Sequence, residues 1–348
     1  MSGGLDSSSV VSLLSESNPS STIDSYSMDF GGLKCDESEY VDSILNTYPL
    51  HHQKIPAGKL DYNQKYSLKH LYAMSPNWPI TTTFAMLIPM FEKMKQDAKK
   101  IVISGQGGDH LFTGTPYVLY DLFRRMKLYP LYKELRTHRR PWNSIKNFIV
   151  RPLLGKRNIR LIKALLGKKD VPSLLEEENG IKDISQIVGV KNPAHKNDLD
   201  MITMAAHSTL MDGNFFHCAE NYFGIEYRHP FFDLELVEFA LSLPPEMKYK
   251  EGTIEWILRK AMKGILPDKI NNRTDKAEFS ELLIQQIDAI DLNELFDDPY
   301  IVKLGLMEQS VIDSYRKEYE DKTVKYISFF WTIINVEYWY RYNFVEKL

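Results

Sequence analysis

The chain has 348 residues, of which 43% are hydrophobic and 26% charged, and its formal net charge is -3. Such a chain can bury a large core, and its charge argues against a protein built wholly around nucleic acid or a membrane surface. Its two cysteines, Cys35 and Cys218, are far apart, so neither a disulfide framework nor a structural zinc site is indicated. No apolar run approaches the roughly 20 residues that cross a bilayer. We therefore expect a cytoplasmic protein.

A glycine- and serine-rich segment, SGGLDSS, occupies residues 2–8. Glycines let a backbone approach an anion closely, serines add hydroxyl donors, and the apolar run that follows predicts a helix whose first amides favour phosphate. Asp6 fits an anion site only if a cation bridges it to the phosphates, which suggests Mg²⁺. The alternative is a serine-rich helix cap that binds nothing. Because a phosphate loop normally follows a strand, we expect either a fragment or a sheet that lacks or borrows one strand.

The next elements alternate between strand and helix. The sequence predicts a buried strand over residues 22–30, a helix over 38–48, a helix over 82–94 and a short β-branched strand over 100–104. This alternation predicts an α/β fold: a parallel sheet with helices on both faces, whose ligands gather at the carboxyl ends of the strands.

A second glycine-rich segment follows the strand over 100–104. Residues 104–112 read SGQGGDHLF, with glycines and an acid at the end of a predicted strand. Two such loops on neighbouring strands would bring Asp6 and Asp109 together. Two carboxylates around one Mg²⁺ and a triphosphate form a workable site for nucleotidyl transfer, because the metal offsets the repulsion between the acids and the phosphates.

Beyond about residue 116 the pattern becomes mainly helical. Residues 124–169 carry 15 Lys and Arg and one acid, Glu134. This basic segment is interpreted as a pair of solvated helices, with a docking surface for an acidic partner or a grip on RNA phosphate as alternatives. The aromatic run over 329–339 has a helical period, which favours a packing helix over a binding surface.

The ordered motifs resemble one known family, the synthetase domain of asparagine synthetase and its relatives among the PP-loop ATP pyrophosphatases. The resemblance runs nearly end to end. Besides SGGLDSS and SGQGGDHLF, it rests on the segments 227–233 (YRHPFFD), 236–240 (LVEFA), 256–259 (WILR), 266–267 (LP) and 273–276 (RTDK).

The resemblance implies a two-stage reaction with ATP and Mg²⁺. A carboxylate attacks the α-phosphate of ATP to give an acyl-adenylate and pyrophosphate, and an amine then displaces AMP to form an amide. It implies that Asp6 and Asp109 hold Mg²⁺. It implies that Ser2, Gly4 and Ser7 hold the pyrophosphate and that Met28 and Gly105 frame the adenosine. Gly3, Asp6 and Ser104 are also expected among the residues that bind the nucleotide.

Two side chains match positions at the reacting centre of the family. Lys276 falls where relatives carry a lysine that neutralises this centre; the alternative is a solvated lysine. Gln106 stands where asparagine synthetase has glutamate and β-lactam synthetase has tyrosine, so neither proton-transfer scheme carries over. For Arg228 we expect a structural role, as a buried partner of Asp233 or Glu226.

Other positions depart from the family pattern. Glu255 precedes Trp256 where relatives often carry a phosphate-contacting lysine, and a carboxylate there repels ATP unless it points away. His110 replaces the usual acid after Asp109, a variation that resembles the lasso-peptide cyclases. We expect that the N-terminal glutaminase domain of asparagine synthetase is absent. We therefore expect that the substrate, free ammonia or another polypeptide supplies the amine.

The sequence thus predicts one synthetase domain over residues 1–348, with a nucleotide-binding α/β part over 1–115 and a mainly helical substrate part over 116–348. Within this prediction, asparagine synthesis and lasso-type macrolactam formation compete. The expected partners are a small-molecule or peptide carboxylate and a separate protein that supplies ammonia or delivers a precursor. Nucleic acid and membrane are not expected partners. A PP-loop RNA-modifying enzyme and an inactive ATP-binding remnant are the alternatives from other classes.

Overall fold

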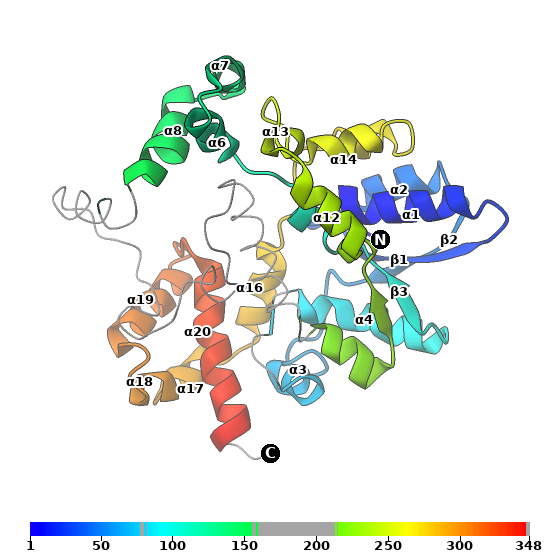
Figure 1. Ribbon diagram of the computed structural model, residues 1–348. Coiled ribbons are helices and arrows are strands. Elements are labelled where there is room, and N and C mark those ends of the chain that lie inside the picture. Colours follow the sequence, from blue (N-terminus) through cyan, green and yellow to red (C-terminus); the bar gives the residue numbers. More distant parts are fainter. Residues whose placement is uncertain (77–79, 82, 155–157, 159–212, 214, 346–348) are drawn as a thin grey trace. The chain divides into compact units, whose positions relative to one another are not determined.

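The computed structural model describes residues 1–76, 80–81, 83–154, 158, 213 and 215–345 (Figure 1). The chain divides into two compact units. Unit 1 consists of residues 1–104, 209–228 and 266–348, and unit 2 of residues 105–208 and 229–265. Each unit has its own hydrophobic cluster. Residues from distant parts of the sequence therefore share a unit.

Unit 1 contains two small parallel sheets. In the first, β1 (Ile23–Asp29) pairs with β2 (Leu50–Pro56) in a register that runs from Ile23 opposite Leu50 to Asp29 opposite Pro56. In the second, β3 (Ile101–Ile103) pairs with β4 (Glu226–Arg228). Parallel neighbours need a crossover connection, and helices lie in the chain between β1 and β2 and between β3 and β4. The parallel pairing predicted from the sequence is confirmed, but the described strands form two separate pairs.

Helices make up most of unit 1. Before β4 these are α1 (Leu5–Ser17), α2 (Ser38–Leu45), α3 (Leu68–Met74), α4 (Phe84–Gln96) and a π-helical turn, η3 (Ala219–Phe223). After unit 2 follow α15 (Asp268–Asn271), α16 (Ser280–Asp288), α17 (Leu292–Phe296), α18 (Tyr300–Lys303), α19 (Gln309–Glu320), α20 (Ile327–Tyr340) and η5 (Arg341–Val345).

The main core of unit 1 forms around α4 and α20. Helix α4 packs against β1 and β2, and α20, drawn in red in Figure 1, contacts α16, α17, α18 and α19. The aromatic run on α20 is buried through Phe330 and Trp331, and the indole of Trp331 donates to the carbonyl of Ile80 at 3.1 Å. A helix that is apolar on most of its surface is stable only when it is surrounded by protein. The predicted packing role of this run is confirmed.

The described part of unit 2 is helical. Its elements are α5 (Gly108–Phe112), α6 (Val118–Arg124), α7 (Leu128–Thr137), α8 (Pro141–Ile145), η1 (Lys146–Val150), η4 (Pro230–Phe232), α12 (Leu234–Ser242), α13 (Pro245–Lys248) and α14 (Trp256–Ala261). Residues of α6, α7 and η1 form a cluster with Tyr249. The basic segment predicted over 124–169 is described here up to residue 154 and at 158; the rest lies outside the described residues.

Two strands, β2 and β4, were not predicted from the sequence. The segment over β2 (LHHQKIP) is polar and carries two histidines, and β4 (EYR) has only three residues, so neither shows a strong strand pattern. In β2, His52 is held by hydroxyls on β1: its Nδ1 lies 2.8 Å from Ser25 Oγ and its Nε2 lies 2.9 Å from Ser27 Oγ. Tertiary partners, which the sequence pattern does not reveal, satisfy these polar groups.

Candidate functional site

The first glycine-rich loop stands at the start of α1 in unit 1. Gly4 precedes the helix with an extended backbone (φ -77°, ψ 157°), and the helix begins at Leu5. The hydroxyl oxygens of Ser2 and Ser7 lie 2.9 Å apart, and the amide of Ser2 donates to Ser7 Oγ at 3.1 Å. The structure therefore confirms a loop that gathers hydroxyl groups at a helix N-terminus, where the first amides and the helix dipole favour an anion.

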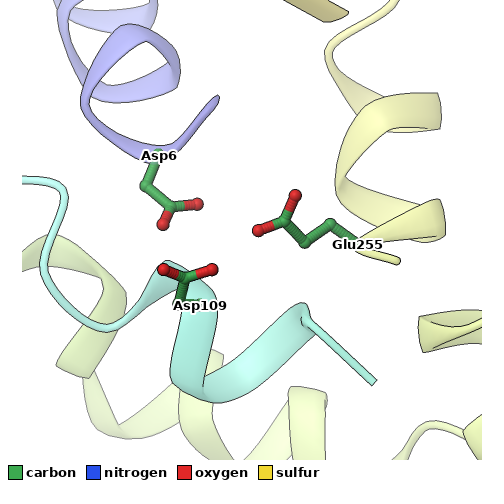
Figure 2. Close-up of side chains that lie close together, drawn as sticks. All are labelled: Asp6, Asp109 and Glu255. Atoms are coloured by element: carbon green, nitrogen blue, oxygen red, sulfur yellow. The ribbon is translucent and has the colours of Figure 1, made fainter. Parts of the chain in front are cut away.

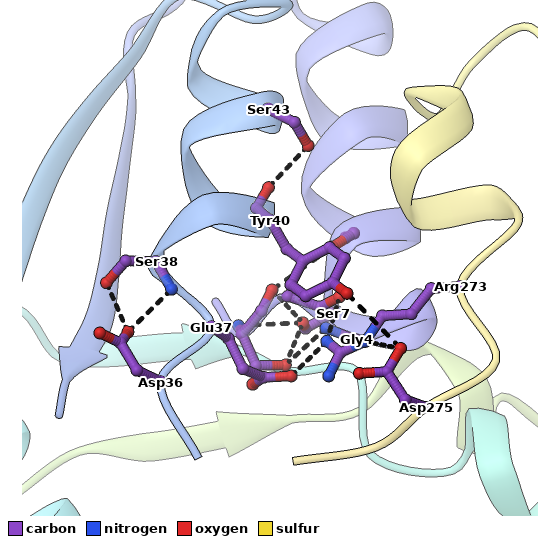
Figure 3. Close-up of polar contacts among 12 residues, drawn as sticks. Gly4, Ser7, Asp36, Glu37, Ser38, Tyr40, Ser43, Arg273 and Asp275 are labelled. Carbon is purple, nitrogen blue, oxygen red and sulfur yellow. Dashed lines mark hydrogen bonds and ion pairs between the residues drawn. The ribbon is translucent and has the colours of Figure 1, made fainter. Parts of the chain in front are cut away.

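Arg273 ties this loop to the segment RTDK. Its Nη1 donates to the carbonyl of Gly3 at 3.0 Å and forms an ion pair with Glu37, and its guanidinium lies over the ring of Tyr40, 4.0 Å from the centroid (Figure 3). Its Nε lies 3.4 Å from Asp275 Oδ1. The side chain is only 7% exposed. Two motifs separated by 270 residues in sequence are thus held together inside unit 1.

The glycine at position 3 is required by this packing. A Cβ atom there would lie 2.4 Å from the Cβ of Tyr40 and 3.2 Å from Arg273 Nη1. Such a contact is far inside the van der Waals limit, so a larger residue would displace the loop or the arginine. The first loop is therefore shaped by both its own hydrogen bonds and its neighbours.

The second glycine-rich loop follows β3 and opens unit 2. Gly107 has a φ of 104°, a left-handed conformation that favours glycine. A Cβ atom on Gly107 would lie 2.9 Å from the Cβ of Phe231 and 3.2 Å from the ring of Phe232. Helix α5 begins directly afterwards at Gly108, with Asp109 in its first turn. The predicted sequence of strand, glycine turn and acid is confirmed.

Asp109 lies beside a second carboxylate of unit 2, that of Glu255. Oxygen atoms of the two groups lie within 4.8 Å of each other and the side chains point toward one another (Figure 2). Glu255 is 3% exposed, and its Oε2 accepts from Arg259 Nη2 at 3.0 Å. The hydroxyl of Thr113 donates to Asp109 Oδ1 at 3.1 Å. Two carboxylates this close repel each other unless cations offset their charge, so the pair fits a metal site.

The backbone fixes the direction of Glu255. Its φ of 56° is left-handed, and its amide donates to the carbonyl of Thr113 at 3.0 Å. The preceding turn is held by Glu134, a buried side chain whose two carboxylate oxygens accept from the amides of Glu251 and Gly252 at 2.8 and 2.9 Å. Strained backbone of this kind persists only where the surroundings hold it in place. Glu255, which departs from the family pattern, is thus held in its position by contacts within unit 2.

Asp6, the other predicted metal ligand, is drawn in Figure 2 as well. It occupies the first turn of α1 and belongs to unit 1. That Asp6 and Asp109 of unit 2 bind one metal ion together therefore stays a prediction.

The remaining predicted residues fall in both units. Met28 lies in β1, one residue before its end, and the amide of Ser104, just after β3, donates to the carbonyl of Arg228 at 3.0 Å. Gly105 and Gln106 precede Gly107 in unit 2. Lys276 is exposed in the connection between α15 and α16, three residues after Arg273. Their predicted contacts with a nucleotide stay predictions.

The structure corrects the interpretation of Arg228. Its guanidinium is exposed, and its Nε lies 2.9 Å from Glu226 Oε1. The predicted partner Glu226 is right, but the predicted burial is wrong. Asp233, the other partner considered, instead accepts from the amides of Glu235 and Leu236 and caps α12. A strand residue at a sheet edge keeps its long side chain in water while it pairs locally.

Residues that support the site were not found from the sequence. Glu37 and Tyr40 hold Arg273, and Glu134 holds the turn before Glu255. Glu134 gave a signal, since it is the one acid in a segment with 15 bases. Glu37 and Tyr40 lie in an ordinary amphipathic helix and its approach, where nothing in the pattern marks them.

Comparison with known proteins agrees with the motifs. The family model for asparagine synthase matches residues 1–341. The chain belongs to the asparagine synthase family. It is 24% identical over 302 residues to asparagine synthetase [glutamine-hydrolyzing] 1 of Bacillus subtilis (strain 168), a match that covers 78% of this chain and 44% of that protein.

A second relative matches a shorter stretch. Asparagine synthetase [glutamine-hydrolyzing] 3 of the same organism is 50% identical over 46 residues, which is 13% of this chain and 8% of that protein. The chain spans less than half the length of the curated relatives that it matches. Within the described residues, no helix is long and apolar enough to cross a membrane.

Proposed function

We propose that this protein is an ATP-dependent ligase that forms an amide bond. It activates a carboxylate as an acyl-adenylate with release of pyrophosphate, and an amine then displaces AMP. The observation that carries the proposal is the connection of the two family motifs in unit 1, where Arg273 of RTDK donates to the backbone of the loop SGGLDSS. Family membership supports the same reaction class.

In this proposal the first loop binds the pyrophosphate part of ATP. Ser2 and Ser7 present hydroxyl groups beside the first amides of α1, and these donors are the kind that hold a phosphate leaving group. Arg273 keeps the loop in shape through the Gly3 carbonyl. Lys276, three residues further, is proposed to neutralise the negative charge that develops at the reacting centre.

The acids are proposed to hold Mg²⁺. Asp109 and Glu255 fit a cation because their oxygens lie within 4.8 Å and Glu255 is almost fully buried. We propose that Asp6 is a further ligand of this ion. The ion would offset the charge of the triphosphate, and Arg259 limits the repulsion that Glu255 alone would add.

The proposal also assigns nucleotide binding and carboxylate binding to different parts of the chain. We propose that the parallel strands and α1 form a PP-loop nucleotide site, with the nucleotide bound by residues 1–115 and the carboxylate recognised by the helical part over 116–348. Met28, Ser104 and Gly105 are then proposed to border the adenosine, and Gln106 to border the reacting groups. Asparagine synthesis and macrolactam formation share this activation step and differ in the carboxylate that is activated and in the amine that attacks it.

The activation step is tested by product analysis. Incubation with ATP, Mg²⁺ and a panel of carboxylates that includes aspartate should release pyrophosphate, and addition of an amine such as ammonia should then release AMP. The variants Asp6→Asn and Asp109→Asn should each lower this rate at least about a hundredfold, because removal of a charged metal ligand weakens transition-state stabilisation by several kcal/mol. Asp321→Asn, at an exposed acid in unit 1, is the control and should leave the rate unchanged. Release of ADP and phosphate would contradict the proposal.

A further inference from the structure

Three of the most exposed large apolar side chains of unit 2 lie on and around α7. Met126 is 72% exposed, Tyr129 77% and Trp142 80%. They belong to the segment 124–142, which runs from the end of α6 through α7 to the start of α8 and is called the α7 segment here. Exposed apolar side chains that gather in one region mark interaction sites more often than scattered ones do.

This exposed surface is distinct from the side of α7 that packs. Leu131 is buried in the hydrophobic cluster of unit 2, and Leu135 packs against that cluster. Tyr129, Tyr132 and Arg136 are spaced at i, i+3 and i+7, so they share the opposite, exposed side of the helix. The guanidinium of Arg136 lies 5.8 Å from the ring centroid of Tyr132. The helix therefore has one core face and one outward aromatic and basic face.

The charges of the α7 segment also divide into two groups. Arg125 and Lys127 lie within ion-pair distance of Glu246, and Lys133 pairs with Glu251. The acid of the segment, Glu134, is buried and accepts from backbone amides.

The other bases of the segment are all arginines: Arg124, Arg136, Arg139 and Arg140. Among the residues that the structure describes, none places a carboxylate within 4 Å of these four guanidinium groups. Arginine binds carboxylates through two parallel hydrogen bonds, which the compact ammonium group of lysine cannot do.

We propose that the α7 segment is a docking surface for an acidic polypeptide that also carries apolar side chains. Its carboxylates pair with the four arginines, and its apolar groups cover Trp142, Tyr129 and Met126. Tyr, Trp, Met and Arg are enriched at protein interfaces, and these are the residue types that the proposed surface offers; the exposed lysine beside them, Lys133, pairs with Glu251. A bilayer or a nucleic acid recruits lysine as readily as arginine, so both fit the composition less well.

The surface is tested with defined probes on the full chain. A fluorescein-labelled copolymer of glutamate and tyrosine serves as the acidic apolar polypeptide, and polyglutamate of the same length serves as the purely acidic one. Vesicles of phosphatidylcholine with phosphatidylserine, and bulk tRNA, test the two other anionic surfaces. The copolymer should bind the wild-type chain more tightly than any of the other three probes.

The variants separate apolar from charged contributions. Tyr129→Ser with Trp142→Ser, and Arg139→Glu with Arg140→Glu, should each weaken copolymer binding at least about tenfold, a loss typical of hot-spot residues. All four side chains are exposed, so the fold should persist, as circular dichroism will verify. Arg→Lys replacements at the same four arginines keep the charge and should still weaken binding about threefold or more. Leu234→Ser, at a residue 70% exposed in unit 2, and Lys317→Glu with Lys322→Glu are matched controls and should have no effect.

Each contrary result overturns the proposal. If polyglutamate binds as tightly as the copolymer, apolar contacts do not contribute to binding. If the control variants weaken binding as much as the test variants do, the α7 segment is not the binding surface. If the vesicles bind more tightly than the copolymer, the partner of this surface is a membrane. If tRNA binds more tightly, the partner is a nucleic acid. This experiment measures binding and not pyrophosphate release. Its result therefore tests the docking surface independently of the proposed ligase activity.

Discussion

The two glycine-rich loops have similar sequences but are held in different ways. The loop over 2–8 in unit 1 is held by polar contacts, namely the hydrogen bonds of its own serines and the guanidinium of Arg273. The loop over 105–109 is held in unit 2 by close packing, because Gly107 has a left-handed backbone against Phe231 and Phe232. Similar motifs can therefore be stabilised by hydrogen bonds and charge in one case and by steric fit in the other.

This difference has a consequence for the acids that follow each loop. Asp109 lies beside the buried carboxylate of Glu255 in the same unit, whereas Asp6 lies in the first turn of α1 in the other unit. The packed loop thus presents a partly assembled acidic pair. The polar loop presents hydroxyls and amides, which suit an anion.

The largest expected effect comes from filling the space at Gly107. Gly107→Ala should destabilise unit 2 by about 3 kcal/mol, because the new Cβ combines a left-handed backbone with a clash against Phe231. Gly264→Ala is the matched control: Gly264 also has a positive φ, of 89°, but nothing lies within 4 Å of a Cβ there. It should cost about 1 kcal/mol. Urea unfolding followed by fluorescence measures both; equal losses would show that packing does not hold the second loop.

A smaller effect is expected from removing the clamp on the first loop. Arg273→Ala should lower the free energy of unfolding by about 2 kcal/mol, since it leaves the partly buried Glu37 without its cation. Addition of Glu37→Gln should recover part of this loss, because it removes the unpaired charge. Denaturant titration of the wild type, both single variants and the double variant measures the coupling. Purely additive losses would show that the ion pair does not hold the loop.

The smallest expected effect is a dependence of stability on pH in unit 1. Burial, with a smaller contribution from the positively charged N-terminus, lowers the pKa of His52 from 6.5 to about 4. The unfolded chain therefore binds this proton more readily than the folded one, and stability is lost as the pH falls from 6.5 toward 4. We expect a loss of about 1 kcal/mol, after allowance for the partial exposure of the ring.

The variant His52→Gln checks this assignment. Its free energy of unfolding should vary less than that of the wild type between pH 6.5 and 4, because glutamine does not titrate. Parallel pH profiles of the two proteins would contradict the assignment.

Much of the fold was visible in the sequence where the pattern was strong. Strand β1, helix α4 and the apolar helix α20 were predicted because their side chains follow a clear period or form an apolar run. The strands β2 and β4 were not, since β2 is polar and β4 is short. Their stability comes from pairing with β1 and β3, which lie elsewhere in the sequence.

The residues of the candidate site also differ in how far the sequence predicted them. The sequence marked both loops, Asp6, Asp109 and the segment RTDK, because glycines, hydroxyls and acids in those patterns have few other uses. It flagged Glu255 only as a departure from the family pattern. Its position beside Asp109 depends on a left-handed backbone and on the turn that Glu134 holds.

The sequence by itself determined the family, the two glycine-rich loops and the acids that follow them, because these depend on residue types at short spacing. The tertiary structure alone decided that Arg273 reaches the Gly3 carbonyl, that Glu255 turns toward Asp109, and that four arginines and three large apolar side chains remain exposed around α7. Each of these depends on contacts between residues far apart in the chain. Local propensity carries no information about such contacts, since packing and charge pairing arise only once the chain has folded.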